Sequence, residues 1–277
     1  VKSVVTRGDA RHVCYCHSPM RYAWDQFDAY FGPAQVGKWP SLALRPVMAA
    51  LARWDAATAG RVDRFLANSQ YVAGRIRRYY NRGSTVVYPP VDTDYYRPDA
   101  SRARAGSGAL VVSALVPYKR LDLAIEACRR GGTPLRIVGR GPELPRLQTL
   151  AAGADVEFLG WRSDEDIRQL YRSAEVVLLP GTEDFGIVPV EAQACGTPVV
   201  ALDAGGARET VIPGLTGGLV PTSDPGDWAE AIEAVRRQPQ DRAVRFDRGT
   251  RGNRQRHTGA TGRHTTTDCP TSLRCSR

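Results

Sequence analysis

The chain has 277 residues, of which 42% are hydrophobic and 24% charged, a profile typical of a soluble globular protein with one large or two ordinary domains. It contains no run of 18 apolar residues of the kind that spans a bilayer. Its first residues lack the pattern of a secretory signal, and six Cys do not make a disulfide framework, so we expect a cytoplasmic location.

A net charge of +9 is compatible with a polyanionic partner such as a nucleic acid, but the distribution of the charge along the chain argues against one. Residues 241–277 hold nine Arg and three Asp with neither Lys nor Glu, so two thirds of the excess charge lies at this end of the chain. Residues 1–240 lack a basic stripe with interleaved stacking aromatics. We therefore expect no nucleic-acid partner.

Residues 1–98 show a mixture of strand and helix patterns. The strand patterns lie at residues 12–16, 63–67 and 85–88, and the helix patterns at residues 41–60, where Pro46 disturbs the start, and 71–80. We interpret this region as a partial N-terminal, acceptor-side Rossmann-like domain. Residues 99–107 are mostly small or polar and end in Gly106-Ser107, a composition that is typical of a linker between domains.

Residues 108–240 alternate strand and helix patterns six times, which favours an α/β fold with a parallel, doubly wound sheet. Near-continuous Val and Leu runs indicate strands that are covered on both faces. The expected strands are 110–115, 135–138, 156–159, 176–179, 198–202 and 218–220, and the expected helices are 119–130, 142–152, 163–173, 188–195, 206–212 and 225–237. Such sheets bind ligands beyond the carboxyl ends of their strands.

Residues 241–277 do not continue this pattern, because Leu273 is the only large aliphatic residue after residue 249. A segment of this composition buries too little apolar surface to offset the entropy of ordering. We interpret it as a disordered basic tail or as an out-of-frame translation, and we favour the second.

The most specific chemical pattern runs from Glu183 to Glu191, after a buried strand and at the start of a helix. Pro189 suits a first helical turn, and Gly186 permits close approach of the backbone. Amide groups and the helix dipole at such a start make a seat for a phosphate. The alternative is an acidic helix N-terminus that is stabilised only by the dipole.

This segment resembles the E-x7-E signature of glycosyltransferase family 4, whose GT-B fold has two Rossmann-like domains. Further segments that resemble this family are residues 16–25, 111–120, 137–143, 158–161 and 205–206 with Glu209. Residues 16–25 and Tyr118-Lys119-Arg120 resemble its mannosyltransferase-like branch. By this resemblance the N-terminal domain is incomplete and the C-terminal end aberrant, so we expect weak nucleotide binding and poor turnover.

The resemblance implies a retaining transferase that needs no metal for transfer and no cofactor besides a nucleotide-diphosphate sugar as co-substrate. The implied catalytic residues are His17 and Glu183. The implied donor-phosphate residues are Lys119, Arg120, Phe185, Gly186 and Ile187, and the nucleotide residues are Gly139, Arg140, Trp161 and Glu191. Arg21, Tyr22 and Trp24 are implied to contact the acceptor or to pack at the surface. Ala114 stands where the family usually has an Arg.

The implied reaction moves a sugar, for which we expect mannose from GDP-mannose, to a glycan or lipid-linked acceptor in polysaccharide biosynthesis. A GT-B nucleotide-sugar epimerase, a GT-B phosphorylase and a non-catalytic basic nucleic-acid-binding protein are the alternatives. A phosphorylase of this fold would carry lysine-bound pyridoxal phosphate.

Two other clusters have a functional and an ordinary interpretation. His12, Cys14 and Cys16 share one strand face, but three ligands on a short strand make poor tetrahedral geometry, so we expect buried thiols and no metal. Four Arg residues interleaved with apolar ones indicate either a solvated helix face or a peripheral contact with anionic lipid. They are Arg45, Arg53, Arg61 and Arg64.

Overall fold

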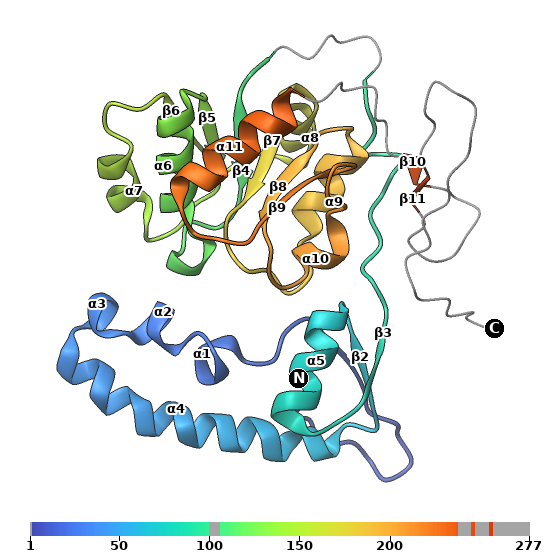
Figure 1. Ribbon diagram of the computed structural model, residues 1–277. Helices are drawn as coiled ribbons and strands as arrows, with labels where there is room; N and C mark the ends of the chain where they lie inside the picture. Colours follow the sequence, from blue (N-terminus) through green and yellow to red (C-terminus); the bar gives the residue numbers. More distant parts are fainter. Residues whose placement is uncertain (1, 100–105, 238–244, 247–254, 257–277) are drawn as a thin grey trace. The chain divides into compact units, whose positions relative to one another are not determined.

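The computed structural model describes residues 2–99, 106–237, 245–246 and 255–256, and the chain divides into two compact units, Val1–Pro89 and Pro90–Arg277 (Figure 1). Most of the expected linker at 99–107 lies outside the described residues, as does most of the expected tail at 241–277. Within that tail, β10 (Arg245–Phe246) and β11 (Gln255–Arg256) form an antiparallel pair.

The first unit is built on three parallel strands in the order β1-β2-β3. They are β1 (Val13–Cys16), β2 (Arg64–Ala67) and β3 (Ser84–Val86), all within two residues of the strands predicted from sequence. The helices are α1 (Arg21–Trp24), α2 (Phe27–Phe31), α3 (Pro33–Val36), α4 (Lys38–Thr58), the 3-10 turn η1 (Ala59–Arg61) and α5 (Gln70–Tyr80). Phe65, Val72 and Ile76 are buried at the centre of this unit.

Helix α4 begins three residues before the predicted start and contains Pro46 in its interior. A proline there removes one N–H from the helix ladder, but this exposed residue does not end the helix. At the start of α5, the hydroxyl of Ser69 accepts a hydrogen bond from the N–H of Val72 at 3.0 Å. This side chain therefore caps the helix.

The second unit contains a six-stranded sheet in which every neighbouring pair is parallel and the order is β6-β5-β4-β7-β8-β9. Its strands are β4 (Ala109–Val112), β5 (Leu135–Val138), β6 (Val156–Gly160), β7 (Val176–Leu179), β8 (Val199–Leu202) and β9 (Gly217–Val220). The direction of winding reverses between β4 and β7. The doubly wound parallel sheet predicted from the sequence is therefore confirmed.

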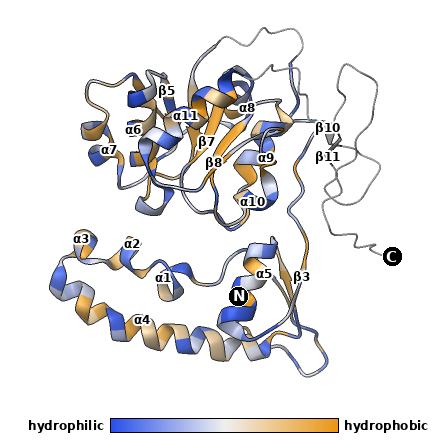
Figure 2. Ribbon diagram, viewed as in Figure 1, coloured by the Kyte–Doolittle hydropathy of each residue, from blue (hydrophilic) through white to orange (hydrophobic). Residues whose placement is uncertain are grey.

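Helices cover both faces of this sheet, and Figure 2 shows hydrophobic strands between them. One core cluster joins the strands to α6 (Leu121–Gly131), α7 (Leu144–Leu150) and α11 (Pro225–Arg236). The other joins them to α8 (Asp164–Ser173), α9 (Ile187–Ala194) and α10 (Ala207–Thr210). Because both faces are buried, the central strands β4, β7 and β8 consist of apolar residues.

The structure differs from the sequence prediction where β4 passes into α6. The strand ends at Val112 rather than at residue 115, and a 3-10 turn, η2 (Pro117–Lys119), precedes the helix. Arg120 has a φ of +52°, in the left-handed region, so the chain cannot form one continuous helix from residue 119. Residues 113–116, between the strand and this turn, form a loop.

The four described cysteines are free thiols, of which Cys14 is half-buried and Cys16, Cys128 and Cys195 are buried. Burial raises the pKa of both Cys128 and Cys195 to about 12, so these thiols are protonated at neutral pH. Among the described residues, no group of three His, Cys, Asp or Glu is arranged to hold a metal ion. No described helix has the length and apolar character needed to cross a membrane.

Replacing Trp228 by Ala tests the core of the second unit. Its side chain is fully buried between α11 and the sheet, and its indole donates a hydrogen bond to the carbonyl of Thr222 at 2.9 Å. We expect Trp228→Ala to lower the free energy of unfolding by about 3–5 kcal/mol, measured by urea denaturation followed by circular dichroism. Trp161→Ala, at a position that is 64% exposed, should change it by less than about 0.5 kcal/mol. Equal losses in the two variants would contradict this packing.

Candidate functional site

The loops that follow β4, β5, β7 and β8 meet at the carboxyl edge of the sheet, where the winding reverses. Glycines allow their backbones to approach closely. A Cβ on Gly139, whose φ is +139°, would lie 1.8 Å from the carbonyl oxygen of Ser113. A Cβ on Gly181 would lie 2.5 Å from the carbonyl oxygen of Tyr118. The loop after β4 is therefore held between the loops after β5 and β7.

The loop after β8 closes the other side of this arrangement. The N–H of Gly206 donates a hydrogen bond to the carbonyl of Glu183 at 2.8 Å, and a Cβ on Gly205 would lie 2.3 Å from the same oxygen. This contact fixes the backbone of the segment that carries Glu183 and Phe185. The sequence segments singled out on separate strands are thus neighbours in space.

Lys119 and Glu183 form an ion pair across the loops after β4 and β7. Their side chains are only 17% and 13% exposed. The ammonium also lies 5.2 Å from the centre of the Tyr118 ring. A partly buried cation at this edge can neutralise an anionic ligand, and the carboxylate beside it can accept hydrogen bonds from hydroxyl groups.

Arg120 turns toward its own helix. Its guanidinium contacts Asp122 at 3.2 Å in the first turn of α6, and the pair is partly exposed. Ala114, in the loop before Arg120, is exposed.

Helix α9 begins at this edge with Gly186 as its N-cap, at a φ of +81° and with no side chain as cap. Phe185 is buried under the turn, whereas Ile187 is 42% exposed. The N-terminus of a helix carries a partial positive charge and N–H groups that face outward. The arrangement therefore fits the phosphate seat that the sequence predicts.

Glu191 lies inside α9 and is half-buried. The hydroxyl of Tyr171, on α8, donates a hydrogen bond to its Oε2 at 3.0 Å. Burial raises the pKa of Glu191, hydrogen bonds from Tyr171 and Tyr96 lower it, and the charge of Asp164 raises it further. Neither tyrosine was identified from sequence, because their relation to Glu191 exists only in the folded chain.

The remaining predicted nucleotide residues lie past the ends of β5 and β6. Arg140 is exposed, and its carbonyl accepts a hydrogen bond from the N–H of Leu115 at 3.0 Å. Trp161 follows β6 and is 64% exposed. Both side chains are accessible to a planar ligand along this edge of the sheet.

The predicted site residues of the first unit follow β1. His17 is exposed, and its ring meets that of Tyr15 edge to face at 4.9 Å between centroids. Tyr22 is 36% exposed, and the Nε of Arg21 contacts the hydroxyl of Ser18 at 3.4 Å.

Trp24 is half-buried and packs against other side chains of this unit. Its ring stacks on Tyr79 at 4.6 Å between centroids, and its Nε1 donates to Asp55 at 2.8 Å. Arg75, which is 5% exposed, pairs with Asp25 at 2.9 Å and donates to the hydroxyl of Ser18 at 3.1 Å. This network holds the segment after His17, and no pattern within one helix could have predicted it.

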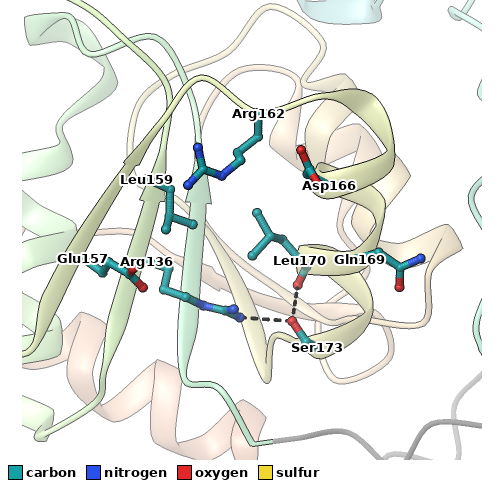
Figure 3. A pocket seen from close by; sticks show the side chains of 8 residues that line it. All are labelled: Arg136, Glu157, Leu159, Arg162, Asp166, Gln169, Leu170 and Ser173. Carbon is teal, nitrogen blue, oxygen red and sulfur yellow. Dashed lines mark hydrogen bonds between the residues drawn. The ribbon is translucent and has the colours of Figure 1, made fainter.

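A separate pocket of about 320 Å³ lies between strands β5 and β6 and helix α8 (Figure 3). Its Arg136 donates a hydrogen bond to the hydroxyl of Ser173 at 3.2 Å, drawn as a dashed line in the figure. The pocket is lined by Arg136, Glu157, Leu159, Arg162, Asp166, Gln169, Leu170 and Ser173. None of the predicted site residues lines this pocket. Its two arginines and two carboxylates give it no net charge.

Comparisons with known families agree with the division into two units. A family described as glycosyl transferases group 1 matches residues 106–252, which is more than half of the chain. A second, glycosyltransferase family 4, matches residues 2–95.

Curated relatives carry the name D-inositol 3-phosphate glycosyltransferase. The protein of Mycobacterium sp. (strain KMS) is 36% identical over 195 residues, covering 62% of this chain and 44% of its own length. That of Saccharomonospora viridis is 35% identical over 224 residues, covering 70% of this chain and 52% of its own length. The chain therefore spans about half the length of the relatives that it matches.

Among solved structures, Anabaena HepE in complex with UDP-glucose is similar with a TM-score of 0.62 and 28% identity, over 70% of this chain and 60% of that one. Its complex with UDP and glucose gives a TM-score of 0.66 at 24% identity, over 84% and 64%. Sucrose-phosphate synthase from Thermosynechococcus elongatus shares the fold, with a TM-score of 0.62 at 24% identity over 81% and 57%. These neighbours establish a GT-B glycosyltransferase fold.

Proposed function

Because this chain belongs to the group 1 family of glycosyl transferases, we propose that it binds a nucleotide-diphosphate sugar and transfers the sugar to an acceptor hydroxyl. The observation that carries the proposal is the convergence of Lys119, Glu183 and the N-terminus of α9 at the carboxyl edge of the second unit's sheet. A diphosphate needs a cation and N–H donors, and a sugar needs carboxylate acceptors. This edge offers all three.

The proposed roles follow from chemistry. Lys119 and the backbone of Phe185, Gly186 and Ile187 stabilise the charge that develops on the departing diphosphate. Glu183 accepts hydrogen bonds from the sugar hydroxyls. Arg120 stays a proposed phosphate residue, although it must leave Asp122 to act as one.

Nucleotide recognition is proposed for the side chains at the ends of β5, β6 and in α9. Glu191 accepts hydrogen bonds from the ribose hydroxyls, while Gly139, Arg140 and Trp161 line the base. The glycine at position 139 supports this assignment. It has no side chain, so the backbone at the end of β5 lies close to Ser113 and remains accessible to a base.

The proposed chemical step is attack of the acceptor oxygen on the anomeric carbon from the face that the diphosphate leaves. The bond from that carbon to the phosphate oxygen breaks, and the departing oxygen takes the acceptor's proton. No cofactor besides the nucleotide sugar enters this step.

His17, an exposed imidazole directly after β1, is the proposed catalytic residue of the first unit. Arg21 and Tyr22 are its proposed acceptor contacts. The packing of Trp24 favours a structural role for it.

We propose GDP-mannose as donor and a glycan or lipid-linked acceptor, on the resemblance of residues 16–25 to mannosyltransferases. The names of similar proteins suggest a different donor and a different acceptor. HepE was solved with UDP-glucose, and the curated relatives are named for D-inositol 3-phosphate.

The family match favours a transferase over an epimerase or a phosphorylase. The alternative of a basic nucleic-acid-binding protein relies on the charge of residues 241–277, which lie mostly outside the described residues.

Calorimetric titration of the 277-residue chain with GDP, UDP and ADP tests the donor proposal. We expect GDP to bind at least about tenfold more tightly than the other two, and Glu191→Ala to weaken it by about tenfold or more, because a hydrogen bond to a charged group is lost. Glu157→Ala removes an exposed carboxylate on β6 and should leave the affinity unchanged. A preference for UDP would exclude GDP-mannose, and equal weak binding of all three would refute the donor site.

We also propose that α4 of the first unit contacts an anionic membrane surface. Large apolar side chains recur along one side of this helix and are about half exposed or more: Trp39, Leu42, Val47 and Trp54. Lys38, Arg45 and Arg53, all exposed, accompany them on the same helix. Apolar side chains with flanking cations match the interface of a bilayer that contains anionic lipid.

Sedimentation with lipid vesicles tests this contact. The protein should bind vesicles that contain phosphatidylglycerol more tightly than phosphatidylcholine vesicles, with a difference that shrinks as salt increases. Trp39→Ser combined with Leu42→Ser should weaken this binding by about tenfold. The control is Val87→Ser, a similarly exposed apolar residue outside α4. Equal sedimentation with both lipids, or no effect of the double variant, would rule the surface out.

A further inference from the structure

The carboxylate of Glu191 is held by two tyrosines that come from different parts of the second unit. Tyr171, on α8, is fully buried, and its hydroxyl donates to Oε2 of Glu191 at 3.0 Å. Tyr96, near the start of the unit, packs beside Tyr171, and its hydroxyl lowers the pKa of this carboxylate. The two rings contact each other at 6.1 Å between centroids. The three side chains form one cluster, which we name the Glu191 cluster.

The position of Tyr171 is fixed by its surroundings. Its ring belongs to the core cluster formed with Ala174, Val177 and Ala192. Its backbone carbonyl accepts a hydrogen bond from the hydroxyl of Thr197 at 2.5 Å. A phenol buried in apolar surroundings needs a hydrogen-bond partner for its hydroxyl, and Glu191 supplies it. The ring is therefore a rigid support for the carboxylate.

The two hydroxyl groups also act on the charge of Glu191. Burial disfavours the ionised form and raises its pKa, and the charge of Asp164 adds to this effect. The hydrogen bonds from Tyr171 and Tyr96 oppose it, because they favour the carboxylate. A carboxylate has about four acceptor positions, so two phenols leave others for a ligand.

We propose that Tyr171 and Tyr96 are positioning residues for recognition of the nucleotide ribose: they orient the Glu191 carboxylate so that it accepts hydrogen bonds from the ribose hydroxyls. The inference rests on the proposed function of Glu191 and extends it to two residues outside the E-x7-E segment. It requires no contact between either tyrosine and the nucleotide.

The test compares a ribonucleoside diphosphate with its 2′,3′-dideoxy analogue, which lacks the hydroxyls that Glu191 would bind. The probe is the tightest binder among GDP, UDP and ADP, titrated calorimetrically into the whole chain. The wild type should prefer the ribose form by about tenfold or more. Tyr171→Phe should weaken the ribose form by about five- to tenfold and leave the dideoxy form within about twofold. Tyr96→Phe should do the same to a smaller extent.

A neighbouring tyrosine provides the matched control. The hydroxyl of Tyr95 contacts Glu165 at 3.4 Å instead of Glu191, so Tyr95→Phe should change neither affinity. A second readout is the pH profile of ribonucleotide binding between pH 4 and pH 8, taken as about the range over which a raised carboxyl group titrates. Tyr171→Phe removes a hydrogen bond that lowers the pKa of Glu191, so the acidic limb of the profile should move to higher pH.

The outcomes separate this inference from the proposed function. If the wild type prefers ribose but Tyr171→Phe keeps that preference, Glu191 acts without the tyrosines and the inference is wrong. If Tyr171→Phe weakens both forms equally, its role is general packing, which also overturns the inference. If the wild type does not distinguish the two forms, the ribose contact itself fails, and the inference fails with it.

Discussion

The close approach of four backbone loops at the carboxyl edge of one parallel sheet is the constraint on which the candidate site depends. Gly139 lies against the carbonyl of Ser113, and Gly205 against that of Glu183, at distances that a Cβ would not tolerate. Parallel pairing brings the ends of β4, β5, β7 and β8 to the same edge, where the direction of winding reverses between β4 and β7. Side chains far apart in sequence therefore share one small region.

Two carboxylates in that region have different electrostatic environments. Glu183 is paired with the ammonium of Lys119, which compensates its charge. Glu191 contacts the hydroxyl of Tyr171 rather than a cation, and burial raises the pKa of its carboxyl group. In the proposed complex a diphosphate competes with Glu183 for Lys119, whereas the neutral ribose diol only adds hydrogen bonds to Glu191. The pair and the Glu191 cluster thus suit the charged and the neutral part of one nucleotide.

The sequence was informative where a local pattern decides structure. Strands that are buried on both faces have near-continuous apolar runs, and β5 and β7 lie at the predicted residues. The predicted strand was wrong at residues 113–115, which lie in a loop. The predicted helix was wrong at residues 119–120, because the sequence pattern does not reveal that Arg120 takes a left-handed backbone. Sequence patterns also missed Tyr171 and Arg75, whose partners, Glu191 and Asp25, lie on other elements. Charged and phenolic contacts of this kind arise only from tertiary packing.

The central claim is that Lys119 and the start of α9 hold a diphosphate at this edge. Calorimetric titration of wild type and Lys119→Gln with a nucleoside diphosphate and with the matching nucleoside tests it most directly. We expect the wild type to bind the diphosphate at least about a hundredfold more tightly, and Lys119→Gln to lose most of that difference while binding the nucleoside as before, because a charge-assisted contact is removed. An undiminished preference for the diphosphate in Lys119→Gln would contradict the account.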